Sequence, residues 1–569
     1  MGKVDQKNKR GDIYKITDAV IHLYLVYMFV IFPLVLHDGY KDITITKYNF
    51  FKNGVLALLI IMALLLVLYL TDRSGNTGHP GSDRAVSKKH TILASDVFMV
   101  LFLIAGFFAF LAAKDRMAAF TGELGRRCGF AFLLLVGAAY ICVAVGCSVK
   151  EWIYPVFACV SGLTYLMSIL QHLEIDLFHL YASIRFDQRP MFISTFGNIN
   201  MYASFLCLTI PLFMAAGMYA DKCWKRVLYT FVLFLGGMAV IAANSDVAYI
   251  GIGVPMVVLL LAGIRNRVKT YDDRMVIGQN STCDPFLGWL IGYAGIVLGY
   301  TVMAFLTTGT GKGYDKLTGL AKLVDHRLIL TIESIVLVIG SLLYGWGSRK
   351  KADCVVAQKK GLRSVKDKKQ ASTMGCWKVI FWSVVGILIL TAFVTVVTGV
   401  GNQWEIFTFD DEWGNYRGYV WNRLFRIYQD LPFVNKVFGT GNESIYTLMS
   451  ARYSDEMIEV TGTVYDSAHN EYLQYLVTMG IVGLITYLGL IITSIVNGVK
   501  LVKENPLCMP LLAGMIGYVV QAFVNVEQPI PTPFLFLFLA LMAVMRRRSL
   551  QELTGLWKYR LVKVLYFVV

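Results

Sequence analysis

Charged residues are scarce in this sequence, and this scarcity excludes an ordinary soluble protein. Only 16% of the 569 residues are Asp, Glu, Lys or Arg, whereas 56% are hydrophobic; soluble globular chains have roughly 25% charged residues. Segments such as 55–70, 227–243, 286–306 and 379–400 carry almost no charge. They approach or reach the roughly 20 residues that span a bilayer as a helix. The sequence therefore predicts membrane helices.

Cysteine pairs at short spacing are also lacking. None of the ten cysteines forms a Cys-x-x-Cys pair, and most lie in or beside apolar runs, which is typical of small core residues and not of a zinc or disulfide framework. The cysteines therefore predict no zinc site, and no other cofactor is expected. The net charge of +15 is most concentrated in one loop between two spans, where contact with anionic lipid is the simpler explanation. We expect membrane lipids, and no nucleic acid, as partners.

A cleavable signal peptide is not expected either, because the first apolar run, 19–36, is long and has no obvious small-residue cleavage site. We interpret this run as a retained first helix. Fourteen candidate spans follow from the apolar pattern, and we predict an all-α polytopic membrane protein with about 12–14 transmembrane helices. The spans are 19–36, 55–70, 98–113, 128–147, 152–170, 202–219, 227–243, 247–264, 286–306, 328–344, 379–400, 472–495, 507–524 and 533–545.

The distribution of lysine and arginine predicts that both termini lie in the cytoplasm. With the amino terminus inside, the basic segments around residues 3–15, 222–226, 265–269, 349–369 and 546–548 all fall on the inner side, as the positive-inside rule requires. Four cations, Lys114, Arg116, Arg126 and Arg127, fall on the outer side and depart from the rule. The expected location is the cytoplasmic membrane of a bacterium, with many passes.

The longest hydrophilic stretch, 401–471, lies outside the membrane in this topology. Before residue 471 it holds ten acidic and five basic residues, together with several aromatics, and we expect a folded cap there. Four regions follow from this division: transmembrane helices 1–11 with their loops (1–400), one large external loop between late helices (401–471), helices 12–14 (472–545) and a basic amphipathic tail on the cytoplasmic surface (546–569).

A histidine stands where this large loop enters the next span. His469 is preceded by Asp466 and followed by Asn470 and Glu471. Imidazole titrates near neutral pH and can serve as a general base when a carboxylate or carbonyl orients it. Such a position predicts a base that acts on an acceptor hydroxyl, although a lone interfacial histidine is more often a structural hydrogen bonder.

Other polar phrases accompany this histidine in the outer loops. Residues 416–421 contain Arg417 and Trp421, and residues 439–441 read Gly-Thr-Gly. An earlier loop contains Arg185 and Arg189 and is followed by Thr-Phe-Gly-Asn-Ile-Asn at 195–200. Each arginine could also be an ordinary headgroup-facing cation, each glycine a turn residue, and the asparagines at 198 and 200 helix caps.

Taken in order, these phrases resemble the O-antigen ligase/polymerase-like family of bacterial membrane glycosyltransferases. The segment 195–200 is similar to the family's glycine and paired-asparagine signature, Arg417 with Trp421 to its Arg-x-x-x-Trp, 439–441 to its Gly-x-Gly, and His469-Asn470 with Tyr472 to its His-Asn-x-Tyr. The resemblance implies a glycosyltransferase C-like fold, a polyprenyl-diphosphate-linked glycan as donor, and a glycan, lipid or protein hydroxyl as acceptor, without a metal ion.

The resemblance also implies roles for individual residues. His469 would be the catalytic base and Arg417 the first choice for holding the departing diphosphate, because a guanidinium contacts phosphate oxygens through paired donors. We expect Arg189, Arg185, Trp421 and Asn470 to bind substrate. One departure from the family pattern stands out: where members commonly have Ser-Arg-Gly, this chain has Asn-Ser-Asp at 244–246.

Two other functions stay open from the sequence. A secondary transporter is one, although we find no pair of broken helices in two halves and few carboxylates inside the spans. A catalytically inactive scaffold that binds lipid-linked glycan is the other, because of the missing Ser-Arg-Gly arginine. The sequence does not distinguish a ligase from a polymerase.

Overall fold

The structure is a computed structural model of the chain, and it describes residues 2–74, 91–122, 125–277, 284–310, 327–359 and 410–553. Its long helices before the cap are α1 Gly2–Val26, α2 Ile43–Ser74, α3 Ala94–Ala112, α5 Phe130–Gly146, α6 Ile153–His172, α7 Ile199–Met218, α8 Cys223–Ala243, α9 Asp246–Ile277, α10 Pro285–Thr310 and α12 Arg327–Lys359. After it come α17 Glu471–Thr478, α18 Gly480–Val502, α19 Met509–Gln521 and α20 Thr532–Leu553.

Short elements connect these helices. A π-helical turn, Tyr27–Ile31, and the 3-10 turns Phe32–Leu34, Phe186–Met191 and Pro506–Cys508 lie between longer helices, as does α4, Arg116–Thr121. The strands β1, Phe192–Ile193, and β2, Gly197–Asn198, form a two-stranded antiparallel sheet in the loop before α7, with Phe192 opposite Asn198.

The described residues confirm an all-α polytopic membrane protein. Ten of their helices are long and apolar enough to cross a membrane, and Phe130–Gly146 and Pro506–Gln521 are shorter apolar helices. The predicted span 533–545 lies within α20. The predicted span 379–400 and residues 554–569 of the predicted tail lie outside the described residues.

Helix α7 lies at the centre of the bundle. Its side chains are buried almost throughout, and it packs against α8, α9, α10 and α19. Because it is buried mainly among other helices, its apolar composition reflects packing and not contact with lipid. Helices α2 and α12, by contrast, expose many of their apolar side chains, including Leu64 and Leu342. These exposed faces are typical of helices that border lipid.

The predicted span 472–495 is divided in the structure. Helix α17 ends at Thr478 and α18 begins at Gly480, which has a φ of +69°. A Cβ at Gly480 would lie 2.3 Å from the carbonyl oxygen of Val437, so a glycine is needed where another backbone approaches this closely. The apolar run crosses the membrane only over Gly480–Val502.

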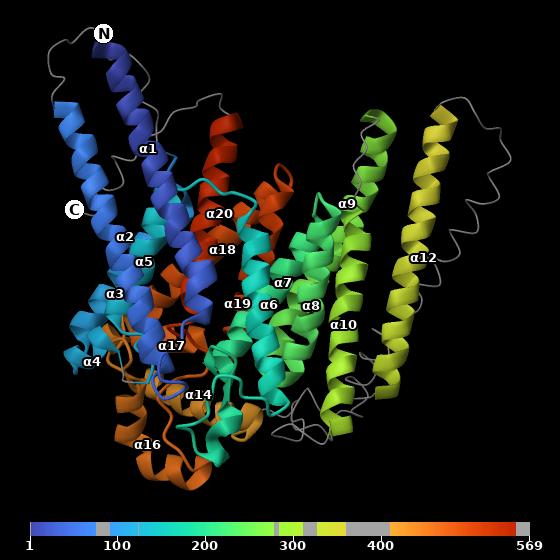
Figure 1. The fold of residues 1–569 in the computed structure, drawn as a ribbon. Coiled ribbons are helices and arrows are strands. Elements are labelled where there is room, and N and C mark those ends of the chain that lie inside the picture. Colours follow the sequence, from blue (N-terminus) through green and yellow to red (C-terminus); the bar gives the residue numbers. More distant parts are fainter. Residues whose placement is uncertain are drawn as a thin grey trace.

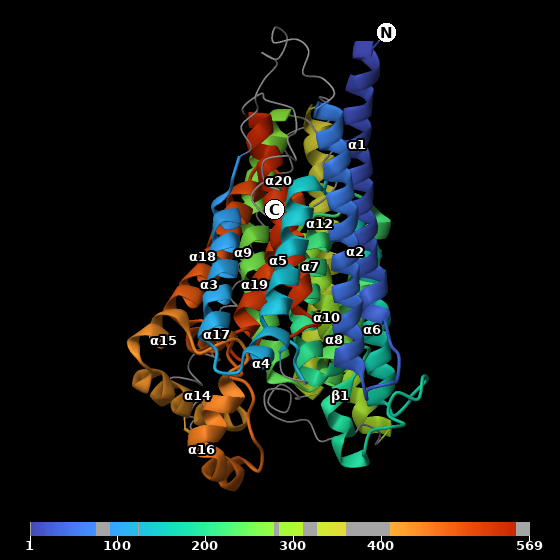
Figure 2. The ribbon, with the colours of Figure 1, turned by 90° about the vertical axis from the view of Figure 1, so that its left-hand side faces the viewer.

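Residues 410–470, which we call the cap, form a folded unit at one end of the bundle (Figures 1 and 2). They contain α14 Trp413–Asp430, α15 Phe433–Phe438 and α16 Ile445–Thr461. Leu424 and Met449 belong to a small apolar core of their own. The described part of the predicted cap is therefore helical and has a core. The described start of α1 lies at the opposite end of the bundle (Figure 1).

Candidate functional site

Four segments meet at the cap end of the bundle, and hydrogen bonds join them. They are the α4–α5 loop, the start of α7, the cap, and residues 522–531 between α19 and α20. Arg417 of the cap donates from Nε to the carbonyl oxygen of Val524 (3.1 Å), and Arg126 of the α4–α5 loop donates to that of Glu527 (3.1 Å). Asn525 donates to the carbonyl oxygen of Asn200 (3.1 Å). The 522–531 loop therefore connects the elements around the site.

His469 lies in the last turn of the cap, with a φ of +46°. Its ring meets that of Tyr465 edge to face at 5.6 Å. Among the described residues its buried Nδ1 has no hydrogen-bond partner. Burial, together with the charges of Arg417 and Arg126, lowers the pKa of His469 from 6.5 to about 3, while Asp466 opposes this shift. The imidazole is therefore neutral at physiological pH, as a general base must be.

Arg417 is held by backbone carbonyls in a tight turn. Gly414, Asn415 and Tyr416 have φ values of 61°, 58° and 63°, so the chain bends sharply just before the arginine. Besides its bond to Val524, Arg417 donates to the carbonyl oxygen of Gly414 (2.5 Å). Burial lowers the pKa of Arg417, and the charge of Asp246 partly offsets this. A fixed guanidinium with N–H groups left over is suited to binding an anion.

Asp246 stands where the family commonly has the arginine of Ser-Arg-Gly. It is the first residue of α9, and its carboxylate is close enough to Arg417 to act on that group's pKa. The departure seen in the sequence thus reverses the charge at this position, beside Arg417. Besides that of Arg417, a second positive charge acts on His469 from the α4–α5 loop.

That charge belongs to Arg126, which the sequence reasoning did not assign to the site. Arg126 is buried, and its Nε lies 3.4 Å from Oε2 of Glu443. Burial alone would lower the pKa of Arg126, but Glu443, Asp466 and Glu527 raise it, so the arginine stays charged. One sign of this was present in the sequence: Arg126 falls on the outer side of the membrane, where the positive-inside rule predicts few cations.

Three buried glutamates surround this arginine: Glu443, Glu471 and Glu527. Glu471 accepts from the hydroxyls of Tyr487 (2.5 Å) and Tyr518 (3.1 Å), so both its oxygens are engaged away from His469. Burial raises the pKa of Glu527. A carboxyl in such a site is stabilised in its protonated form.

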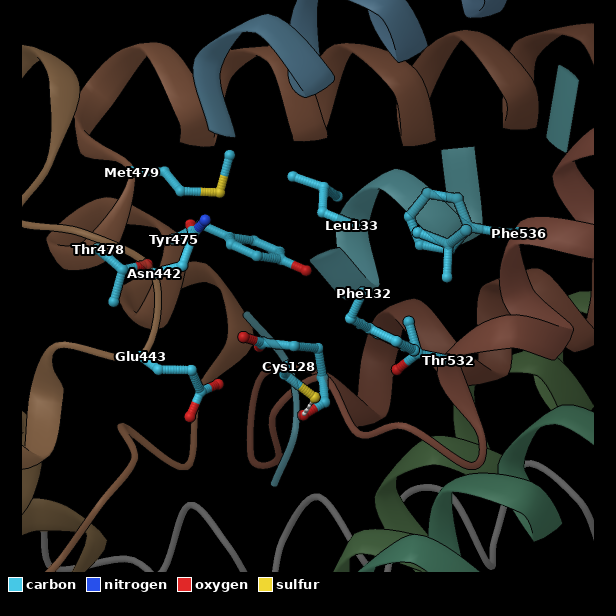
Figure 3. Close-up of a pocket in the computed structure, with 12 residues that line it drawn as sticks. Cys128, Phe132, Leu133, Asn442, Glu443, Tyr475, Thr478, Met479, Thr532 and Phe536 are labelled. Atoms are coloured by element: carbon cyan, nitrogen blue, oxygen red, sulfur yellow. Dashed lines mark hydrogen bonds between the residues drawn. The ribbon is translucent and has the colours of Figure 1, made fainter. Parts of the chain in front are cut away.

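A cavity of about 20 Å³ lies among these groups, which is room for about one water molecule. Figure 3 shows Glu443 and Asn442 from the cap on one side of it, Thr532 on another and Cys128 below the aromatic side chains. It adjoins the Arg126–Glu443 pair and is too small for a sugar. The cavity therefore belongs to the cluster around Arg126 and Glu443 and is not a substrate site.

The Gly-x-Gly segment and Asn470 have structural contacts. Gly439 and Gly441 have φ values of +86° and +113°. The amides of Thr440 and Gly441 donate to the last carbonyls of α17, those of Val477 (3.2 Å) and Thr478 (3.0 Å). Asn470 caps the first turn of α17, because its side chain accepts from two backbone amides there. Both features hold the His469 turn against the bundle.

Trp421 also supports the His469 turn. Its Nε1 donates to the carbonyl oxygen of Ala468 (2.9 Å), and its ring packs against those of Trp413 (5.3 Å) and Phe523 (5.9 Å). Asn198 caps α7 by accepting from the amide of Asn200 (2.8 Å), which agrees with the capping interpretation for Asn198.

Arg185 and Arg189 lie in another loop at the cap end. Arg189 packs against the rings of Tyr181 (5.8 Å) and Phe186 (5.7 Å), and Arg185 pairs with Asp187 (3.3 Å) on an exposed surface. Among the described residues, neither is one of the charged groups that shift the pKa of His469. The structure thus brings His469 together with Arg417, Trp421 and Asn470, and leaves Arg185 and Arg189 in their own loop.

In the part of the chain that the structure describes, the one group of side chains that could hold a metal ion lies away from this site. Asp18, His22 and Cys147 have potential ligand atoms within 4.8 Å of one another. They lie on α1 and directly after α5, and none of them belongs to the cap, to the α4–α5 loop or to residues 522–531. The group therefore has no direct part in the chemistry around His469.

Comparison with known proteins supports the resemblance that the motifs indicated. A family model described as O-antigen ligase matches residues 335–488. The matched range contains the whole cap, Arg417, the Gly-x-Gly segment and His469. No curated protein matches the chain. The match supports an O-antigen ligase-like family, and this family implies glycosyl transfer in a membrane.

Proposed function

We propose that this chain, a multi-pass membrane protein of an O-antigen ligase-like family, transfers a polyprenyl-diphosphate-linked glycan to an acceptor hydroxyl. The acceptor is a glycan, a lipid or a protein, and the step is a ligation or a polymerisation at the outer face of a bacterial cytoplasmic membrane. The observation that carries the proposal is the position of a neutral, buried imidazole, His469, within the electrostatic reach of Arg417 and Arg126 at the cap end.

In the proposed step, Arg417 binds the diphosphate through its guanidinium. The acceptor oxygen attacks the anomeric carbon while the bond from that carbon to the diphosphate oxygen breaks. His469 takes the proton from the attacking hydroxyl, and polyprenyl diphosphate departs with the bonding electron pair. A single displacement of this kind inverts the anomeric configuration and uses no metal ion. Arg189 is the second candidate for the diphosphate, and Arg185, already paired with Asp187, is the weaker one.

In this proposal, the bound donor also changes the pKa of His469. In the free protein the positive charges of Arg417 and Arg126 hold the pKa of His469 low. A bound diphosphate places negative charge beside them and so raises the affinity of the imidazole for a proton. His469 becomes a stronger base only when the donor is present.

The test is replacement of His469 by Ala and, separately, by Gln. We expect both variants to insert normally, to lose mature glycan and to accumulate the lipid-linked precursor, because the proton acceptor is removed. His37→Ala, a change of an exposed histidine in another cap-end loop, is the matched control. Mature glycan at the wild-type level in His469→Ala would refute the proposal. Solute uptake by the purified protein in liposomes would instead indicate a transporter.

A further inference from the structure

A second, larger hollow lies at the cap end, outside the site around His469. Its volume is about 220 Å³, and it lies between α2, α4 and the loop that precedes α5. Its lining residues are Ile45, Tyr48, Asn49, Lys52, Thr121 and Arg127. None of them lines the small cavity beside Glu443. It is smaller than the roughly 300–1,000 Å³ of pockets that enclose drug-sized ligands, so its size suits a headgroup.

The charge of this hollow is positive. Lys52 and Arg127 are its two ionisable cations, and no carboxylate of a described residue lies within ion-pair distance of either one. Other cap-end cations do have such partners: Arg126 pairs with Glu443 and Arg452 with Asp430 (2.7 Å). Two cations that share a partly enclosed space without a counter-charge are stabilised by an anion there.

The backbone fixes Arg127 in this position. Its φ is +58°, which few residues other than glycine adopt. The α4–α5 loop closes tightly on itself, since a Cβ at Gly129 would lie 2.4 Å from the amide nitrogen of Gly122. The two consecutive arginines thus have different surroundings. Arg126 pairs with Glu443 in the interior, and Arg127 lines the hollow.

The hollow lies along the first three turns of the apolar span of α2. Lys52 follows the first residue of the apolar span Ile43–Thr71 by nine positions, which is about 14 Å along a helix. A lysine at this depth extends its ammonium group toward the membrane surface. Below it, α2 exposes Leu56, Ile60 and Leu64, a face along which an acyl or prenyl chain can lie.

We propose that this hollow binds the phosphate group of a membrane lipid. The guanidinium of Arg127 and the ammonium of Lys52 neutralise the phosphate, and the amide of Asn49 is a further donor on the lining. The hydroxyl of Thr121 donates to the carbonyl oxygen of Met117 (2.9 Å) and lines the hollow without donating to the phosphate. The lipid chain follows the exposed face of α2. Two sources share this chemistry, a phospholipid of the surrounding leaflet and a polyprenyl phosphate or diphosphate.

The test is lipid binding by the purified full-length protein, measured by native mass spectrometry. The probes are phosphatidylglycerol, polyprenyl diphosphate and inorganic phosphate. The variant Lys52→Gln/Arg127→Gln keeps much of the side-chain shape but removes both charges, and Arg116→Gln on neighbouring α4 is the matched control. We expect at least tenfold weaker retention of the phosphorylated lipids in the double variant and no change in the control.

The outcomes distinguish a polyprenyl lipid from a phospholipid of the leaflet, and they also show whether the hollow binds lipid phosphate at all. Preference for polyprenyl diphosphate over phosphatidylglycerol assigns the hollow to a polyprenyl lipid, and equal retention assigns it to lipid phosphate in general. Equal lipid retention by the wild type and the double variant overturns the proposal, as does inorganic phosphate that competes as well as the lipids. If the double variant fails to fold, Lys52→Gln alone must still weaken retention severalfold.

The proposal is independent of glycan transfer. His469→Ala leaves the hollow intact, so it must retain phosphorylated lipid as the wild type does. Loss of transfer in that variant and loss of lipid retention in Lys52→Gln/Arg127→Gln are therefore separate results.

Discussion

At the scale of single residues, the surroundings of His469 determine its pKa more than its residue type does. Burial and two guanidinium charges bring its pKa from 6.5 to about 3. Its neutral, proton-accepting form is therefore present at every pH above about 3, and only stronger acid would convert it to the imidazolium form. An unperturbed histidine would lose this form below about pH 6.5.

This shift predicts the pH dependence of the transfer step. For the free protein, we expect kcat/KM to show no acidic limb from His469 between about pH 5 and 8. With donor bound, the diphosphate opposes the arginine charges, so the acidic limb of kcat should lie at higher pH than that of kcat/KM. Steady-state rates across this range check both points. An acidic limb of kcat/KM near 6.5 that disappears in His469→Ala would contradict the shift.

Arg417 gives a second prediction at this scale. Arg417→Lys keeps a positive charge but removes the fork that bonds to Val524 and Gly414 and presents paired donors to a phosphate. We expect a loss of at least tenfold in kcat/KM with folding retained, measured as glycan transfer by the purified protein. Arg426→Lys, an exposed position two turns along α14, is the control. Near-normal transfer by Arg417→Lys would remove this residue from the donor site.

At the scale of elements, the contact between the Gly-x-Gly segment and α17 places the His469 turn. Gly439 approaches the end of α17 so closely that a Cβ there would lie 2.1 Å from the carbonyl oxygen of Thr478. The neighbouring amides bond to the same helix end. The cap is thus fastened to the bundle at the point where the chain of α17 and α18 bends.

The matching prediction compares two glycines of positive φ. Gly439→Ala adds a backbone clash to a φ of +86°, whereas Gly462→Ala adds only strain, because nothing lies within 4 Å of its Cβ position and its φ is +69°. We expect Gly439→Ala to lower stability by more than about 3 kcal/mol and Gly462→Ala by about 1 kcal/mol. Thermal unfolding in detergent measures the difference. Equal losses of stability in the two variants would mean that the close contact at Gly439 has no effect on stability.

At the scale of the whole molecule, the described ends of the bundle differ in what they carry. One end has the cap, His469 and the Arg126 cluster, and the other has the start of α1 and the basic end of α20. The alternation of the described helices is consistent with the predicted topology, in which both termini are cytoplasmic and the cap faces outward.

Labelling of single introduced cysteines tests this orientation. Glu459 is an exposed cap residue, and Lys503 is exposed at the opposite end after α18. In intact cells we expect a membrane-impermeant maleimide to modify Glu459→Cys, and to modify Lys503→Cys only after permeabilisation, each compared with the parent chain and its ten cysteines. The reverse pattern would place the cap in the cytoplasm and remove the basis for transfer at the outer face.

The sequence by itself determined the membrane class, most of the spans, the presence of a cap and the motif that contains His469. These features depend on local composition and spacing, which hydropathy and short motifs report directly. The break between α17 and α18 was not predicted, because Gly480 lies inside a continuous apolar run and its special backbone follows from the approach of Val437.

Only the tertiary structure decided which polar groups meet. Arg126 and Glu527, which share a hydrogen bond, are 401 positions apart in the chain, and no local pattern relates them. The separation of Arg189 from the charges that act on His469 likewise depends on how whole loops fold over the bundle end. Electrostatic effects depend on distance in space and on burial, and both are set by packing between distant segments.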